Sequence, residues 1–292
     1  MTPDDWHITG DLTRFLSRAG EFLRSRPALH TVHLTVTEAL GGRGLRVYGE
    51  GDPVFGVLER GGDVRAAFFR TPPGRLMLTP AGAKEAAGLA AQLALRGDEL
   101  PGVMAELDTA AGFAREWARL TGADLGLHAR QRLYRLGELT PPYPLPPGRP
   151  RIAAANDRER LVRWYVEFTE AIGESGTSQD PGEWADARIA YGGITLWETP
   201  DGVPVSMAGI TPKVAGQVRV APVYTPADLR GRGYAGAVTA EVSRMARAAN
   251  AREVLLFTDL ANPTTNALYQ RLGYRPVEDF AGYDFHAGPA PR

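Results

Sequence analysis

The order of apolar and polar positions in the C-terminal half predicts an alternation of strands and helices. Val254–Phe257 is apolar without alternation, which is typical of a central parallel strand covered on both faces. Before it, apolar residues recur at helical spacing and predict a helix from Arg230 to Ala249, with Asn250 as a C-terminal stop. After it, Asn262-Pro263 supplies an N-cap and a first-turn proline for a second helix that ends at Gly273.

The remaining residues of this half complete an α/β unit. Asp157 is expected to cap a helix whose apolar face contains Leu161, Trp164, Tyr165 and Phe168. A hairpin is expected around Asp201-Gly202. The other expected elements are a strand at 151–153, a helix at 183–190, hairpin strands at 193–198 and 203–210, and closing strands at 274–278 and 283–286.

The N-terminal half repeats this rhythm. We expect hairpin strands, a third strand, and then helix, strand, helix and strand, at residues 54–60, 64–70, 75–79, 83–95, 103–107, 110–120 and 131–136. The order parallels the second half and suggests an ancient duplication. The segment between them, residues 140–150, contains six prolines, which favour an extended connector of roughly 30 Å. We therefore expect domains at 1–139 and 151–292, joined by a linker at 140–150.

Composition limits the classes of function. The chain has 292 residues, 43% of them hydrophobic, and a net charge of −1, so no basic excess is available for nucleic acid. It contains no cysteine, which excludes disulfides, thiolate zinc sites and an acetyl-cysteine intermediate. The histidines show no ligand spacing, and we expect no metal. No signal peptide or membrane-spanning run is recognised, so a cytoplasmic protein without membrane contact is expected. The oligomeric state stays open.

The segment Arg230-Gly231-Arg232-Gly233-Tyr234-Ala235 carries most of the functional information. It lies between an apolar strand and the start of a helix. Glycines let the backbone approach a ligand, and the helix N-terminus adds partial positive charge, so the turn suits a pyrophosphate. Two arginines strengthen that preference. A solvated turn and an RNA-binding arginine-glycine tract contain similar residues, but the order of elements around this segment favours a cradle for coenzyme A.

The last predicted helix carries a second constellation. Asn262, Asn266 and Tyr269 lie at i, i+4 and i+7 and share one face. Leu268 and Leu272 are expected to serve as its core stripe, which leaves the polar face free to meet a ligand. The alternative is a helix cap, a surface amide and a half-buried aromatic residue.

These motifs resemble those of the GNAT N-acetyltransferase superfamily. Arg230–Ala235 fits its (Arg/Gln)-x-x-Gly-x-(Gly/Ala) signature, and the resemblance covers the whole C-terminal half. It implies an α/β (α+β) fold of two tandem GNAT-like domains, each a mixed, mostly antiparallel sheet flanked by helices. The first domain resembles a degenerate member, since Thr79–Lys84 replaces the cradle without a glycine pair or an arginine.

The resemblance also implies acetyl-CoA as acyl donor and assigns roles to residues. Asn262 would contact coenzyme A, Asn266 could reach the pantetheine amides, and Tyr269 would act as general acid toward the departing thiolate. The strand that ends at Val223, Tyr224 and Thr225 would splay from its neighbour, and its backbone would pair with pantetheine. A backbone N–H near Thr225 would hold the acetyl oxygen. The family's usual proline is replaced by Ala227, with Pro226 one residue earlier.

The implied reaction is direct acetyl transfer to a primary amine. Asp259 and Glu170 are weak candidates for the general base, and a water chain is an equal alternative. A small-molecule amine is the favoured acceptor, although a protein acceptor stays open. Two further hypotheses remain: a catalytically silent acyl-CoA-binding sensor or regulatory module, and an acyltransferase that uses a longer or acidic acyl group.

Overall fold

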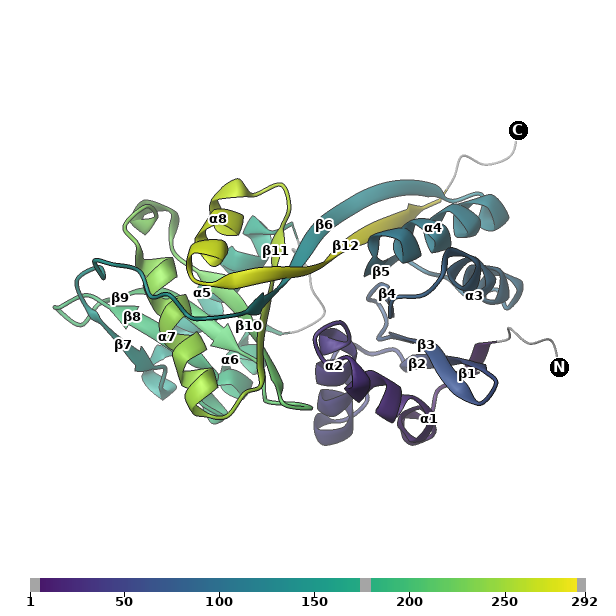
Figure 1. Ribbon diagram of the computed structural model, residues 1–292, viewed down its shortest axis with the longest axis horizontal. Coiled ribbons are helices and arrows are strands. Elements are labelled where there is room, and N and C mark those ends of the chain that lie inside the picture. Colours follow the sequence, from purple (N-terminus) through teal and green to yellow (C-terminus); the bar gives the residue numbers. More distant parts are fainter. Residues whose placement is uncertain (1–5, 174–179, 288–292) are drawn as a thin grey trace. The chain divides into compact units, whose positions relative to one another are not determined.

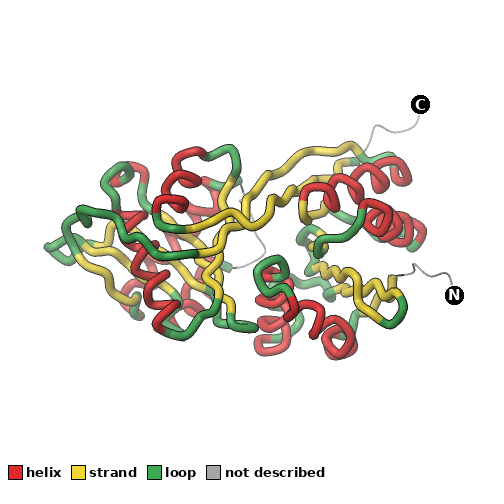
Figure 2. The backbone as a smooth tube through the Cα atoms, in the orientation of Figure 1, coloured by secondary structure: helices red, strands yellow, loops and turns green. Residues whose placement is uncertain are grey.

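The computed structural model describes residues 6–173 and 180–287, which form two compact units (Figures 1 and 2). Unit 1 comprises the chain up to Arg132, Asp259–Ala261 and the residues from Glu278 onward. Unit 2 comprises Leu133–Thr258 and Asn262–Val277. Within the described residues, no helix combines the length and apolar character that a membrane span requires.

The chain contains two consecutive runs of elements in the same order: strand, helix, helix, three strands, helix, strand, helix, strand. The first run consists of β1 Trp6–Thr9, α1 Leu12–Ser25, α2 Thr31–Arg43, β2 Val54–Arg60, β3 Asp63–Arg70, β4 Leu76–Leu78, α3 Ala83–Leu95, β5 Gly102–Glu106, α4 Leu107–Thr121 and β6 Asp124–Leu136. The second consists of β7 Arg149–Ile152, α5 Arg158–Ala171, α6 Pro181–Ala190, β8 Ile194–Glu198, β9 Pro204–Ile210, β10 Gln217–Tyr224, α7 Tyr234–Ala248, β11 Glu253–Asp259, α8 Pro263–Arg271 and β12 Tyr274–His286.

The repeat expected from the apolar pattern is therefore present, and it is longer than the pattern indicated. Sequence analysis assigned nothing before residue 54, whereas the structure adds β1, α1 and α2 there. The helix α2 contains three threonines and two glycines, which are poor helix formers, so its signal is weak. The strand β6 begins at Asp124, seven residues before the expected start at Gln131.

The strands of the two units follow the same plan within one sheet. In unit 1 the strand order is β1-β2-β3-β4-β5-β12, and in unit 2 it is β6-β11-β10-β9-β8-β7. Each unit contains a parallel pair, β4 with β5 and β10 with β11, beside antiparallel hairpins. The expectation of a mixed, mostly antiparallel sheet flanked by helices is confirmed.

The long strands β6 and β12 each contribute residues to both units. The later part of β12 pairs antiparallel with β5, with Phe280 opposite Glu106. The end of β6 belongs to unit 2, where Arg135 lies 3.7 Å from Glu253 of β11. The compact units are therefore divided within these two strands, whereas the sequence places the domain boundary at residues 140–150.

The proline-rich segment at 140–150 lies wholly within unit 2. Its Thr140 N–H donates to the Leu272 carbonyl at 3.0 Å. The Pro146 ring lies 3.8 Å from the position that a Cβ would take at Gly233, just before α7. The segment thus packs along the start of α7. Its last residue, Pro150, belongs to β7, which tolerates proline because it is an edge strand.

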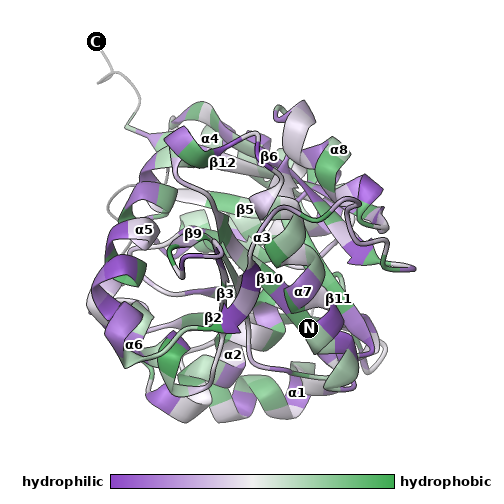
Figure 3. Ribbon diagram, turned by 90° about the vertical axis from the view of Figure 1, so that its left-hand side faces the viewer, coloured by the Kyte–Doolittle hydropathy of each residue, from purple (hydrophilic) through white to green (hydrophobic). Residues whose placement is uncertain are grey.

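Helices cover both faces of the unit 2 sheet. Leu196 and Met207 pack in one cluster with Leu161 and Trp164 of α5, whereas Val205 packs in another cluster with residues of α7. The helices α5 and α6 carry many hydrophilic residues on their other sides (Figure 3). Strands β8 and β9 are accordingly buried on both faces, which their near-continuous apolar sequences indicate.

Two local expectations need correction. The helix expected from Arg230 begins at Tyr234, because Gly231 and Gly233 have φ values of 76° and 84°, in the left-handed region that glycine favours. Asn250 does end this helix region with φ 59°. Asp157 makes no side-chain cap to α5. Its carboxylate is instead occupied by Arg151.

The ion pair between Asp157 and Arg151 generates a stability prediction. Asp157 is 4% exposed and accepts two hydrogen bonds from the Arg151 guanidinium at 2.6 and 2.7 Å and one from the Ala154 N–H at 2.8 Å. We expect Asp157→Asn to lower the free energy of unfolding by about 1.5–3 kcal/mol, because hydrogen bonds to a charged group are lost. Urea unfolding at neutral pH measures this change.

The same pair sets an acid dependence. The Arg151 guanidinium holds the pKa of Asp157 below its ordinary value. Its stabilisation is therefore present above about pH 4 and is lost as the pH falls through the lowered pKa, and the Asn variant should lack this part of the dependence. Asp186→Asn, which breaks the exposed ion pair with Arg158, is the control and should lower the free energy of unfolding much less. Equal losses of unfolding free energy in the two variants would contradict the stabilising role assigned to the Asp157–Arg151 pair.

Candidate functional site

The parallel strands β10 and β11 separate partway along their length. Their pairing covers only Gln217–Arg219 opposite Glu253–Leu255. Beyond Arg219, β10 continues to Tyr224 while paired with β9, with a register shift between Val220 and Val223. In the part of the chain that the structure describes, the β11-facing edge of β10 thus has no strand partner near its end. An extended ligand with amide groups can pair with such an edge.

The turn after this open edge leads to an uncapped helix N-terminus. Gly233 is the N-cap residue of α7, and no side chain caps the helix there. No heavy atom lies within 4 Å of the position that a Cβ would take at Gly231. The first N–H groups of α7, from Tyr234 and Ala235, precede the first helical bond, which Ala237 N–H makes to the Gly233 carbonyl. This end of α7 is therefore suited to an anion.

The two arginines of this turn donate hydrogen bonds to backbone carbonyls of the same turn. Arg230 Nε donates to the Thr225 carbonyl at 3.0 Å, and Arg232 Nη2 donates to the Asp228 carbonyl at 3.0 Å. A neutral carbonyl does not cancel the charge of a guanidinium. Both arginines thus fix the path from β10 to α7 and keep positive charge beside the helix end.

The asparagines of α8 are where the sequence places them. Asn262 is the N-cap residue, and its Oδ1 accepts from the Thr265 N–H at 3.1 Å, so the expected cap is confirmed. Asn266 Nδ2 donates to the Asn262 carbonyl at 2.7 Å, and its Oδ1 accepts from the Tyr134 hydroxyl at 2.9 Å. Both amides are thus held in fixed positions at the start of α8.

Tyr269 lies deeper than expected. It is 7% exposed, packs in the core with Leu272, and meets the Tyr274 ring edge-on at 6.0 Å between centroids. Leu272 is buried and Leu268 is half-buried against the same core, as expected, and the correction is that Tyr269 joins them there. Burial raises the pKa of Tyr269 to about 12. Among the described residues, none hydrogen-bonds its hydroxyl.

A polar cluster at the end of β10 was not found from the sequence. The Tyr224 hydroxyl donates to Glu167 Oε2 of α5 at 2.6 Å. Burial, and then the hydrogen bond to Glu167, raises the pKa of Tyr224 to about 12. Ser206 Oγ donates to the Tyr224 carbonyl at 3.1 Å and lies 2.8 Å from Thr225 Oγ1. Glu167 follows the buried Trp164 by three positions, which is the one sequence signal that it faces the sheet.

The other candidate residues differ in their exposure to solvent. Val223 is half-buried at the end of β10. Asp259, at the end of β11, is exposed and accepts from the Ala261 N–H at 2.9 Å. Glu170, near the end of α5, is also exposed. Of the acidic residues on α5, Glu167 is therefore the one that contacts the end of the open strand.

The corresponding turn of unit 1 is closed. Before α3, the Gly82 N–H donates to Glu85 Oε2 at 2.9 Å, so a carboxylate of the helix occupies its own N-terminus. Thr109 Oγ1, in α4, lies 3.0 Å from the Ala81 nitrogen and 2.8 Å from its oxygen. The turn before α7 is open in unit 2, whereas side chains of Glu85 and Thr109 bridge the corresponding turn here. This turn accordingly lacks the glycine pair and the free helix end of a cradle.

Comparisons with known proteins identify the family of the C-terminal half. Residues 158–274 match the model of the acetyltransferase (GNAT) family. This part of the chain belongs to the GNAT acetyltransferase family. Comparison with curated protein sequences finds no match.

The likeness to solved GNAT structures extends over the whole chain. A GCN5-related N-acetyltransferase from Sphaerobacter thermophilus is 18% identical with a TM-score of 0.63, and the match covers 99% of this chain and 98% of that one. A tandem GNAT protein from the clavulanic acid biosynthesis pathway is 13% identical with a TM-score of 0.60, covering 98% and 100%. A GNAT-family acetyltransferase from Colwellia psychrerythraea is 11% identical with a TM-score of 0.57, covering 96% and 99%. At these identities the likeness shows the fold, and that fold is the expected tandem one.

The burial of Tyr269 generates a prediction at alkaline pH. Because its pKa is raised to about 12, the phenol ionises first in the unfolded chain, and its contribution to stability is lost as the pH rises from about 10 to 12. Tyr269→Phe should therefore reduce the fall of unfolding free energy by up to about 1.4 kcal/mol per pH unit in this range. Urea unfolding at a series of alkaline pH values measures the slope.

Tyr143→Phe is the matched control, since Tyr143 is 98% exposed and the substitution removes a phenol hydroxyl outside the core. Its slope should equal that of the wild type. A Tyr269→Phe slope as steep as the wild-type slope would show that this phenol is not buried.

Proposed function

We propose that this GNAT-family protein transfers an acetyl group from acetyl-CoA directly to a primary amine of a small molecule. The observation that carries the proposal is the separation of β10 from β11 after Arg219, which ends at the uncapped N-terminus of α7. An open strand edge followed by an anion-binding helix end fits a ligand that has amides along an arm and a pyrophosphate at one end.

The residues present fit acetyl-CoA. Gly231 and Gly233 leave the turn open, and the N–H groups from Gly231 to Ala235 would hold the pyrophosphate. The edge of β10 up to Thr225 would pair with the pantetheine arm, with Asn262 and Asn266 on its other side. When bound, this co-substrate supplies a thioester whose acetyl group an amine can attack.

The chain would assist the attacking amine. A free alkyl ammonium has a pKa near 10.4, so a proton must leave before attack. Glu167 contacts the end of the open strand through Tyr224 and is our first candidate for attracting the ammonium and accepting its proton. Asp259 and Glu170 are weaker candidates because both are exposed. The backbone N–H at Thr225 would stabilise negative charge on the acetyl oxygen.

Tyr269 would act on the departing sulfur. Its raised pKa of about 12 keeps the hydroxyl protonated at every working pH. Because a thiol has a pKa near 8.5, complete proton transfer from such a phenol is uphill. A hydrogen bond from the Tyr269 hydroxyl would therefore stabilise the thiolate, and the solvent would complete its protonation.

An assay of thiol release from acetyl-CoA in the presence of primary amines tests the proposal. With an accepted amine, Tyr269→Phe should lower kcat by about 10- to 100-fold, because the hydrogen bond to the leaving sulfur is lost. The Kd for acetyl-CoA should change less than twofold. Isothermal titration calorimetry supplies the Kd, and Tyr143→Phe is the control for loss of an exposed phenol.

An unchanged kcat in Tyr269→Phe would remove this residue from the mechanism. Binding of acetyl-CoA without thiol release toward any amine would favour the alternative of a silent acyl-CoA-binding module. Absence of binding would overturn the proposed function.

A further inference from the structure

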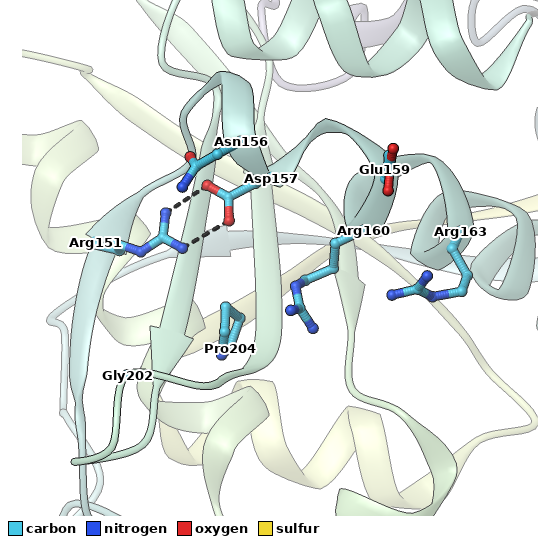
Figure 4. Close-up of a pocket in the computed structure, with 8 residues that line it drawn as sticks. All are labelled: Arg151, Asn156, Asp157, Glu159, Arg160, Arg163, Gly202 and Pro204. Atoms are coloured by element: carbon cyan, nitrogen blue, oxygen red, sulfur yellow. Dashed lines mark hydrogen bonds and ion pairs between the residues drawn. The ribbon is translucent and has the colours of Figure 1, made fainter.

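A cavity of about 310 Å³ lies beside α5 in unit 2 (Figure 4). It is lined by three arginines of β7 and α5, and by Gly202 and Pro204 where the β8–β9 hairpin turns. Arg151 is already neutralised, since its guanidinium pairs with Asp157 and with the buried carboxylate of Glu198. The free positive charge of this cavity therefore comes from α5.

Arg160 and Arg163 supply that charge. The Arg160 guanidinium carbon lies 5.5 Å from the centroid of the Trp164 ring. It also attracts the Asp157 carboxylate electrostatically, but the side-chain hydrogen bonds of that carboxylate are made with Arg151. For Arg163, the described part of the chain offers no ion pair or hydrogen bond. Figure 4 shows both guanidinium groups on the side of α5 where Pro204 lies, and Glu159 lines the same cavity as the one acidic residue of α5 among its lining residues.

The same helix connects this cavity to the end of the open strand. Arg160, Arg163 and Glu167 lie at i, i+3 and i+7 of α5 and share one face. Trp164, under Arg160, lies 6.1 Å from the Tyr224 ring between centroids. The Tyr224 hydroxyl in turn bonds Glu167. One helix face thus presents a carboxylate beside the strand end and two cations farther along.

We propose that the acceptor amine carries an anionic group, a carboxylate or a phosphate, which Arg160 and Arg163 bind while Glu167 receives the ammonium. This inference rests on the proposed acetyl transfer at the end of β10. A helix rises 1.5 Å per residue, so Arg163 and Arg160 lie about 6 and 10 Å along α5 from Glu167. The acceptor is therefore a small zwitterionic amine with its two charged groups separated by several bonds, and diamines are disfavoured because a second ammonium meets two guanidinium groups.

Matched substrates test this inference. Wild-type kcat/KM for thiol release is compared between an ω-aminoalkanoate and its carboxamide, and between an aminoalkyl phosphate and the amino alcohol. We expect at least a tenfold preference for the anionic member of one pair, and the pair that shows it identifies the anion. Arg163→Gln should lower that preference about tenfold or more, because charge-assisted hydrogen bonds are lost. Arg163→Glu should move the preference toward diamines.

Arg244→Gln is the control, since it removes an exposed arginine of α7 that pairs with Glu241. It should keep the wild-type preference. Thermal unfolding of each variant checks that the fold is retained, and Arg163 holds no described partner whose loss would unfold the helix. Acetylation of neutral and anionic amines with equal kcat/KM, or a preference that Arg163→Gln leaves unchanged, would overturn this inference alone. If no amine tested causes thiol release from acetyl-CoA, the proposed function is overturned, and this inference is overturned with it.

Discussion

The short pairing between β10 and β11 is the constraint on which the candidate site depends. Parallel strands that stayed paired to their ends would satisfy each other's backbone groups and leave no room for a ligand between them. Here the pairing stops at Arg219, while β10 continues to Tyr224 along β9. The open edge, the glycine turn and the free end of α7 follow one another along the chain. Each is open to a ligand only because the strands have separated.

The two halves of the chain show that this opening is separable from the fold. Both follow the same order of ten elements, and both contain one parallel strand pair before the turn to a helix. In unit 1, however, Glu85 caps the helix that the turn leads to, and Thr109 bonds the turn to the next helix. A carboxylate at the helix N-terminus occupies the place of an anionic ligand and repels it. The same architecture thus holds a closed turn in one unit and an open one in the other.

Features set by local sequence were predictable. Neighbouring residues determine the buried strand at Val254–Phe257, the Asn262 cap and the glycine turn before α7. The repeated order of elements from residue 54 also follows from local patterns. Features set by distant contacts were not. Glu167 and Tyr224 are 57 positions apart, and only the packing of α5 on the sheet brings them together.

Burial on a helix was also ambiguous from the sequence. Leu268 and Tyr269 are both apolar enough for the core, and the packing of α8 on Tyr274 decides for the tyrosine. The pairing of β12 with β5 joins strands far apart along the chain, so the division of the chain into compact units could not be read from the proline-rich segment.

Calorimetric titration of acetyl-CoA into the protein tests the central claim most directly. The account predicts one site per chain, its loss in Gly233→Glu, and its retention in Gly61→Glu, which places the same charge at another positive-φ glycine, in the β2–β3 turn. Two sites per chain, or undiminished binding by Gly233→Glu, would contradict the assignment of the coenzyme to the start of α7.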